Sequence, residues 1–306
     1  MPAPLLMVIA TFLFATMGVC VKLASEFYQA GEIVMYRGIV GVLILGAVTL
    51  VQGKSLRTAV PAMHFWRSLS GVIALSLWFY AIGKLPLATA MTLNYMSSVW
   101  MALFLIGGGV LLGSARVDSR LVATVLLGFV GVAMVLRPTL DQQQLWHALA
   151  GLLSGMLAAL AYLQVTALGR AGEPEYRIVF YFSLGGVAAG ALTTLSTLTL
   201  KLTDGQVLMH GHHLYGATLL LAVGLLATAA QLMMTRAYGR GKTLVIASLQ
   251  YLGIVFSFAY GTLLFHDPLT AWAFGGMALI IGAGLAATWL RAGSTPKQVQ
   301  HTTKKP

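Results

Sequence analysis

Two carboxamide side chains stand out because each lies within a long apolar run and is followed directly by a tyrosine. They form the dipeptides Asn94-Tyr95 and Gln250-Tyr251. An amide both donates and accepts hydrogen bonds, so such a pair can hold a polar group of a small molecule. The alternative is that each amide joins two neighbouring helices, which contributes about 0.6 kcal/mol per bond between apolar helices. Because the arrangement occurs twice, we expect these two amides and two phenols to belong to a substrate-binding site.

Further polar and aromatic side chains within apolar runs are candidates for the wall of the same site. They are Trp78, Tyr80, Trp100, Tyr162, Gln164 and Gln231. A cavity lined by aromatic, methionine and amide side chains suits a partly apolar organic solute better than a bare ion. For any single aromatic residue of this set, the alternative is a place in the helical core or on the outer surface.

Arg37 is the one strong charge that the sequence places inside an apolar run. A guanidinium there can bind the carboxylate or phosphate of an anionic substrate, or it can extend to lipid headgroups or cap nearby carbonyl groups. Glu32 and His266 lie at the ends of apolar runs and are the candidates for proton coupling; a carrier that needs no buried acid is the alternative. We expect no catalytic residue, no metal and no cofactor. The single cysteine, Cys20, excludes a cysteine-based metal centre.

The segments that carry these residues must lie in a lipid bilayer, because the composition fits no soluble protein. Charged residues make up 9% of the 306 residues and hydrophobic residues 58%, and the mean hydropathy is +0.84. So few charges cannot cover so much apolar surface in water. The composition therefore excludes a soluble enzyme and a nucleic-acid-binding protein. We explain the net charge of +11 by Lys and Arg in cytoplasmic loops.

Ten apolar segments are long enough to cross a bilayer as helices of about 20 residues. They span 3–22, 32–51, 66–84, 87–112, 119–137, 147–169, 178–199, 215–236, 242–265 and 270–290. We expect an all-α integral membrane protein of the inner or plasma membrane. Most of the 19 Lys and Arg fall on the side of the N-terminus, which predicts that both termini are cytoplasmic.

The two halves of the chain are similar to each other, which indicates an internal duplication. Two alignments carry the similarity: 33–41 with 178–186 at an offset of 145, and 81–95 with 237–251 at an offset of 156. Arg37 thereby aligns with Phe182, and Asn94 aligns with Gln250. We expect one five-helix repeat over residues 1–140, a second over residues 145–292, and a disordered basic cytoplasmic tail over residues 293–306.

Because five is odd, the second repeat must enter the bilayer in the inverted orientation. Inverted repeats recur in secondary transporters, where they provide inward- and outward-facing states of similar energy. The predicted architecture is therefore ten transmembrane helices arranged as two inverted five-helix repeats.

The chain resembles the EamA-type members of the drug/metabolite transporter superfamily, which have ten helices in two repeats. The resemblance rests on Ala15-Thr16-Met17-Gly18 with Lys22, on Tyr36-Arg37, on 81–95 with its repeat, and on Trp272–Gly284. Where many relatives carry a Glu at the end of the ninth span, this chain has Phe265-His266-Asp267-Pro268. The resemblance implies a cavity lined by the first, third, fourth, sixth, eighth and ninth spans.

These features predict a secondary transporter that moves a small organic metabolite, an amino-acid-like, partly apolar or amphipathic solute, by alternating access. One alternative is a membrane-embedded acyl or lipid transferase, which would need clustered catalytic groups that the sequence offers only singly. The other alternative is a non-transporting membrane assembly factor. The expected partners are the small-molecule substrate and the bilayer, without nucleic acid. The GxxxG-spaced pairs Gly109/Gly113, Gly151/Gly155 and Gly186/Gly190 fit packing within the bundle, which we expect, or a homodimer.

Overall fold

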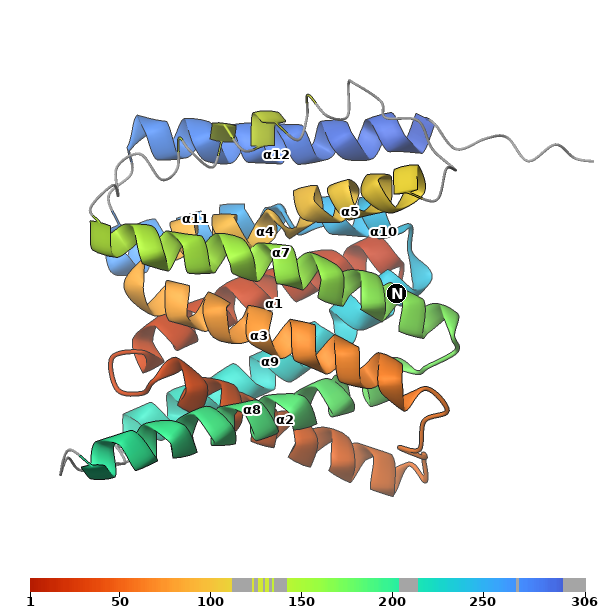
Figure 1. The fold of residues 1–306 in the computed structure, drawn as a ribbon, viewed down its shortest axis with the longest axis vertical. Coiled ribbons are helices and arrows are strands. Elements are labelled where there is room, and N and C mark those ends of the chain that lie inside the picture. The colour runs from red at the N-terminus through yellow and green to blue at the C-terminus, as the bar shows by residue number, and fades with distance from the viewer. Residues whose placement is uncertain are drawn as a thin grey trace, which may run out of the picture.

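The computed structural model describes residues 1–111, 142–203, 214–267 and 270–293, together with a few positions between 123 and 134. All regular elements in this part of the chain are α-helices. They are α1 (Ala3–Ala24), α2 (Ala30–Val51), α3 (Pro61–Lys84), α4 (Leu87–Tyr95), α5 (Ser97–Leu111), α7 (Gln142–Arg170), α8 (Glu175–Thr203), α9 (Leu214–Arg240), α10 (Thr243–Leu249), α11 (Leu252–Phe265) and α12 (Ala271–Gly293). In Figure 1 the helices lie side by side along a common direction, with α12 at one edge and α2 and α8 at the opposite edge.

The helices have the lengths that a bilayer requires. Among the described residues, seven helical stretches are long and apolar enough to cross a membrane, and one of them joins α10 and α11. Each predicted span other than 119–137 coincides with one helix or with a pair of short helices. The span 119–137 and the expected tail lie almost wholly outside the described residues. The chain is a multi-pass α-helical membrane protein.

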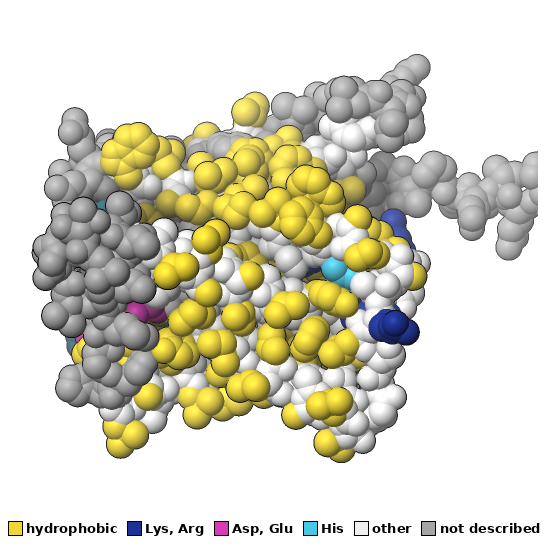
Figure 2. Space-filling model, turned by 60° about the horizontal axis from the view of Figure 1, so that its bottom comes forward, with side chains coloured by type: hydrophobic (Ala, Val, Ile, Leu, Met, Phe, Trp, Pro, Cys, Tyr) yellow, Lys and Arg dark blue, Asp and Glu magenta, His cyan; other side chains and the backbone are white. Residues whose placement is uncertain are grey.

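The outer surface of the bundle is apolar where it would contact lipid tails. Large hydrophobic side chains are exposed on the two helices of one edge, including Leu43 (66%) and Leu50 (83%) on α2 and Leu192 (68%) on α8. Figure 2 shows apolar side chains across one face of the molecule and Lys and Arg side chains at one of its ends. Such a face would be unfavourable in water and is stable in hydrocarbon.

Glycines let the helices pack at close range within the bundle. A Cβ on Gly155 of α7 would lie 2.6 Å from the Leu93 carbonyl oxygen of α4, and one on Gly190 of α8 would lie 2.7 Å from the Gly31 carbonyl oxygen of α2. Because a side chain at either position would overlap backbone, only glycine permits these crossings. The expectation of packing within the bundle is confirmed for Gly151/Gly155 and Gly186/Gly190, whereas Gly113 of the pair Gly109/Gly113 lies outside the described residues.

Two of the predicted spans, 87–112 and 242–265, each contain a break between two short helices. The first break, at Met96, separates α4 from α5, and the second separates α10 from α11. At the second break the backbone N–H groups of Gln250 and Tyr251 bond three residues back, to Ala247 and Ser248, instead of four. This is the tighter 3₁₀ geometry, which within a helix is typical of a hinge or a functional site. Each of the predicted spans 87–112 and 242–265 is therefore built from two short helices.

Candidate functional site

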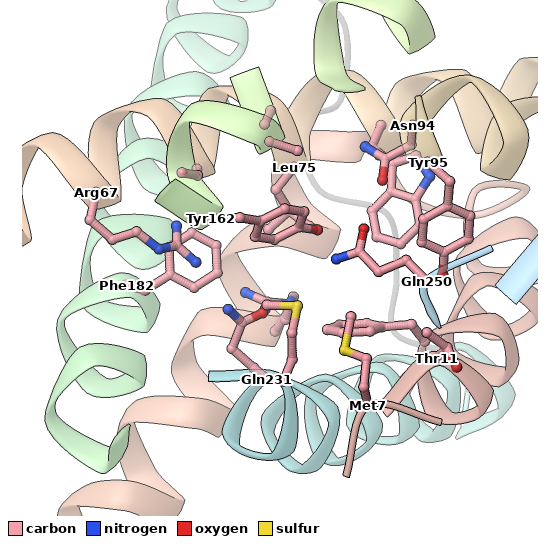
Figure 3. A pocket seen from close by; sticks show the side chains of 18 residues that line it. Met7, Thr11, Arg67, Leu75, Asn94, Tyr95, Tyr162, Phe182, Gln231 and Gln250 are labelled. Carbon is pink, nitrogen blue, oxygen red and sulfur yellow. The ribbon is translucent and has the colours of Figure 1, made fainter. Parts of the chain in front are cut away.

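The two breaks border an internal cavity of about 50 Å³ at the centre of the bundle. Figure 3 shows its side chains converging from several helices. Helices α1, α2, α3, α4, α7, α8 and α9 contribute, as does the α10–α11 break. The lining residues are Met7, Thr11, Phe14, Arg37, Arg67, Gly71, Ala74, Leu75, Trp78, Asn94, Tyr95, Ala158, Ala161, Tyr162, Phe182, Gln231, Met234 and Gln250. In this conformation the space is too small for a metabolite.

The two predicted amides meet at this cavity, and both also join helices. The Asn94 Nδ2 donates to Ser154 Oγ on α7 at 3.0 Å. The Gln250 Nε2 donates to the Tyr238 hydroxyl on α9 at 2.9 Å, and its Oε1 accepts from Ser97 Oγ at 3.3 Å. The alternatives left open by the sequence are thus combined: the amides connect helices and present polar atoms to the cavity. Their contact with a substrate stays a prediction.

Tyr95, beside the first break, packs directly against the second break. Its ring occupies the space that a side chain on Gly253 would take, because a Cβ there would lie 2.6 Å from Tyr95 Cζ. Gly253 is the second residue of α11, and Tyr95 is the last residue of α4. The two interrupted helices therefore contact each other at their interruptions.

Aromatic side chains form the apolar part of the wall. Trp78 is 6% exposed and makes an edge-to-face contact with Phe14, with 6.5 Å between the ring centroids. Tyr162 stacks on Tyr238 at 5.4 Å. Gln231, which is 4% exposed, adds an amide from α9. The lining thus combines aromatic, methionine and amide groups as the sequence indicates, and in addition it contains two arginines.

The second arginine, Arg67, is a correction, because Arg37 is predicted from the sequence to be the one strong charge inside an apolar run. It lies six residues after the start of α3 at Pro61 and is 2% exposed, while Arg37 of α2 is 3% exposed. Both guanidiniums pack on the ring of Phe182, at 5.0 Å for Arg37 and 4.2 Å for Arg67. Arg37 is therefore not the single charge within the spans. Arg67 is the second residue of the predicted span 66–84, but α3 begins five residues earlier, at Pro61, which places Arg67 well inside the helix.

Several predicted wall residues lie elsewhere. Gln164 is outside the cavity and accepts a hydrogen bond from Ser70 Oγ at 2.8 Å, because residues two apart in a helix, such as Tyr162 and Gln164, point to different sides. Tyr251 is buried beside the break but does not line the cavity, and Tyr80 is 41% exposed and packs on His147. Trp100 stacks on Phe104, away from the lining.

The two candidates for proton coupling lie at helix ends. The Glu32 carboxylate accepts a hydrogen bond from the backbone N–H of Gln29 at 2.8 Å, which completes a capping box at the start of α2. His266 is exposed and ends α11 in the left-handed conformation, with φ of 52°. Neither residue lines the cavity. A coupling role for them stays a prediction.

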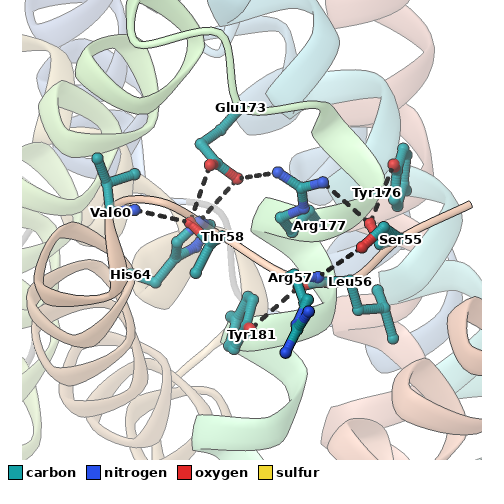
Figure 4. A network of polar contacts seen from close by, with 10 residues as sticks. All are labelled: Ser55, Leu56, Arg57, Thr58, Val60, His64, Glu173, Tyr176, Arg177 and Tyr181. Carbon is teal, nitrogen blue, oxygen red and sulfur yellow. Dashed lines mark hydrogen bonds and ion pairs between the residues drawn. The ribbon is translucent and has the colours of Figure 1, made fainter.

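A buried carboxylate that sequence reasoning missed joins the α2–α3 and α7–α8 connections (Figure 4). Glu173 has a side chain only 6% exposed and accepts hydrogen bonds from Thr58 Oγ1 at 2.8 Å, His64 Nε2 at 3.1 Å and Arg177 Nη1 at 3.0 Å. Burial raises the pKa of Glu173, but these three hydrogen bonds outweigh burial and hold that pKa below its ordinary value. We call these four residues the Glu173 network.

A second polar connection joins helices at the opposite end of the bundle from the Glu173 network. The Lys22 ammonium at the end of α1 lies 3.4 Å from Asp267 Oδ1 and donates to the Leu85 carbonyl oxygen at 3.3 Å. The backbone N–H of Leu87, at the start of α4, donates to Asp267 Oδ2 at 3.0 Å. Lys22 thus joins the end of α1 to the α3–α4 connection and to Asp267, which follows α11. We call this group the Lys22–Asp267 pair.

Sequence comparisons relate the chain to membrane transporters. A family model described as the EamA-like transporter family matches residues 1–137. The pseudopaline exporter CntI of Pseudomonas aeruginosa is 32% identical over 290 residues, which cover 94% of this chain and 96% of the exporter. An uncharacterized transporter of Helicobacter pylori is 25% identical over 286 residues, covering 92% of each chain. A riboflavin transporter of Rhizobium johnstonii is 26% identical over 238 residues, covering 76% of this chain and 71% of that protein.

The fold also matches a solved structure. A crystal structure superposes with a TM-score of 0.66 at 18% sequence identity, covering 96% of this chain and 99% of the other. At this identity the likeness concerns the arrangement of the helices and carries no statement about a ligand.

Proposed function

Because this chain belongs to the EamA-like transporter family, we propose that it is a secondary transporter that moves a small, partly apolar organic solute by alternating access. The cavity carries this proposal: it lies between two interrupted helices, and its lining of mostly buried side chains combines an apolar wall with hydrogen-bonding groups. At about 50 Å³ it is far below the roughly 300 Å³ at which small-molecule sites begin. A solute can therefore enter only when helices separate.

We propose the inverted-repeat architecture of ten helices, with repeats over 1–140 and 145–292, on two further observations. Arg37 and Phe182, which the sequence aligns at an offset of 145, contact each other, as equivalent residues beside a twofold axis would. The two helix breaks fall within two residues of aligned positions, because Met96 aligns with Leu252 at the offset of 156 and the second break lies at Gln250 and Tyr251. Both observations support a pseudo-twofold axis through the cavity, which supplies two states related by symmetry.

The connections at the two ends fit the two gates that alternating access requires. The Glu173 network lies at the end of the bundle that carries the N-terminus, where Lys and Arg side chains gather (Figures 1 and 2), and the Lys22–Asp267 pair lies at the other end. We propose that both termini are cytoplasmic, as the distribution of basic residues indicates. Each connection would then break in one of the two open states.

The relatives support a solute carrier more than they support the alternative classes. One is named an exporter of pseudopaline and another a transporter of riboflavin, and this chain spans most of the length of both. Among the described residues that line the cavity there is no Asp, Glu or His, so it offers no acid–base pair for a transferase. We therefore propose transport rather than catalysis.

The test is transport by the purified protein in liposomes, screened against amino acids, nucleosides, quaternary amines and carboxylates. Once a solute is found, the double variant Asn94→Leu/Gln250→Leu should abolish its transport while membrane abundance stays unchanged. Gln164→Leu is the matched control, because this amide lies outside the cavity, and it should transport normally. Unchanged transport by the double variant would exclude the cavity amides from the pathway.

A further inference from the structure

Two cations without counterions face the cavity. In the part of the chain that the structure describes, neither Nε nor Nη1 of Arg37 or of Arg67 has a hydrogen-bond partner, although all four atoms are buried. No residue among the described cavity lining is acidic. A buried guanidinium without a partner is unfavourable, and two that pack on the same ring also repel each other. Both guanidiniums contact the face of Phe182, and a cation–π contact of this kind contributes about 1–2 kcal/mol.

The surroundings of Arg67 keep its guanidinium at the cavity. A Cβ on Gly71, one helical turn further along α3, would overlap Arg67 Nη1 and would lie 2.9 Å from Phe182 Cε2. Glycine at this position therefore leaves the space that the guanidinium fills. Figure 3 shows Arg67 directed at Phe182 on the side of the cavity opposite Asn94 and Tyr95.

Two further hydrogen-bond donors without partners among the described residues face the cavity. The indole Nε1 of Trp78 and the hydroxyl of Tyr95 are buried and without a hydrogen-bond partner among the described residues. The Asn94 and Gln250 amides, by contrast, have partners in α7, α9 and α5. The unused groups of the lining are thus almost all donors, with two positive charges among them. A ligand that matches them supplies acceptors and negative charge.

We propose that the cavity binds an organic acid with two carboxylates, one held by Arg37 and the other by Arg67, with its carbon skeleton against Phe182 and Leu75. A guanidinium fork matches a carboxylate in a bidentate geometry. Both guanidiniums lie on the ring of Phe182, and this apolar ring favours a dicarboxylate, with carbon between its charges, over a compact dianion such as phosphate. This inference rests on the proposed transport function only for the route by which the acid reaches the site.

The experiment measures binding to the purified wild-type protein with three ligands of one shape: glutarate, its monoamide and its diamide. Each loss of a carboxylate should weaken binding about tenfold or more, because a hydrogen bond to a charged group contributes at least that much. Inorganic phosphate should not compete. Glutarate that binds no more tightly than the diamide would overturn the proposal, and so would phosphate that displaces glutarate at equal concentration. This comparison needs no variant and so does not depend on variant folding.

Variants then assign the charges. Arg37→Gln and Arg67→Gln should each weaken glutarate binding about tenfold or more and remove the difference between glutarate and its monoamide. Gly71→Ala, which displaces the Arg67 guanidinium without changing any charge, should weaken glutarate binding in the same direction. Arg57→Gln is the matched control, since Arg57 is exposed in the α2–α3 connection and far from the lining. Equal glutarate affinity in Arg37→Gln, Arg67→Gln and wild type would refute the assignment.

Failure of this inference is distinguishable from failure of the proposed function. Transport of a neutral or cationic solute that Arg37→Gln and Arg67→Gln leave unchanged would uphold transport and overturn the dicarboxylate site. Arginine-dependent binding of glutarate without transport of any solute would uphold the site and overturn transport.

Discussion

Removing the Glu173 carboxylate should destabilise the protein by a few kcal/mol. The side chain is 6% exposed, so solvent screens its three hydrogen bonds little. Glu173→Ala leaves three donors beside an empty space, and breaking a buried charged network in this way costs about 3–5 kcal/mol. Glu173→Gln keeps the shape and one acceptor oxygen, so its cost should be about 1–3 kcal/mol.

The assay is thermal unfolding in detergent, followed by reaction of the single cysteine, Cys20, with a thiol-specific dye that fluoresces as the protein unfolds. Each kcal/mol should lower Tm by about 2–4 °C. Glu26→Gln is the matched control, because Glu26 is exposed, and it should leave Tm unchanged. Equal Tm values for Glu173→Ala, Glu173→Gln and wild type would refute the reasoning that the network holds the two connections together.

The stabilisation by the Glu173 carboxylate should decrease as the pH falls. Since the pKa of Glu173 is held below its ordinary value of 4.5, its stabilisation is complete above that value. The stabilisation is lost as the pH falls through the lower, folded-state pKa. The difference in Tm between wild type and Glu173→Gln should therefore be full at pH 7 and shrink below about pH 4.5. A difference that grows as the pH falls would contradict the assigned direction.

Three further outcomes are expected. Gly155→Ala should lower stability by about 1–3 kcal/mol in the same unfolding assay, because its Cβ would meet backbone atoms of α4, whereas Gly107→Ala, which meets nothing, should be neutral. Lys22→Met should lower stability by about 1–3 kcal/mol by leaving Asp267 without its cation, and Lys22→Met/Asp267→Asn should recover part of the loss, which a double-mutant cycle measures. A reporter fused after Pro306 should be active in the cytoplasm, and a signal from the opposite side would refute the ten-span topology.

The sequence predicts the helices well because their limits are set by elementary physics. Charges, proline and glycine delimit apolar runs of bilayer length, and a membrane requires those runs to satisfy their own backbone hydrogen bonds. The same reasoning predicts that Asn94 and Gln250 face inward, since hydrocarbon excludes an amide. Both line the cavity, as do Trp78 and Tyr162.

What the sequence does not reveal depends on tertiary contacts. Nothing local distinguishes Arg67 from a loop arginine, because its burial follows from the packing of α3 on α7 and α8. Glu173 lies in a short connection, and its partners Thr58 and His64 are more than 100 residues earlier in the chain. The breaks contain no proline, so the α4–α5 interruption, like the other, is set by the packing of neighbouring helices rather than by propensity.

The contact of Tyr95 with Gly253 has a consequence for the proposed transporter, because it couples the movement of α4 to the movement of α11. If α4 rotates about its break, the phenol ring moves, and α11 cannot stay where it is because the ring fills the space beside it. This contact therefore links the movement of α4 in the first half of the chain to that of α11 in the second. This linkage opposes a state in which both ends are open, which would be a channel and would dissipate any solute gradient. A single glycine facing a tyrosine thus bears on whether the protein concentrates its solute or leaks it.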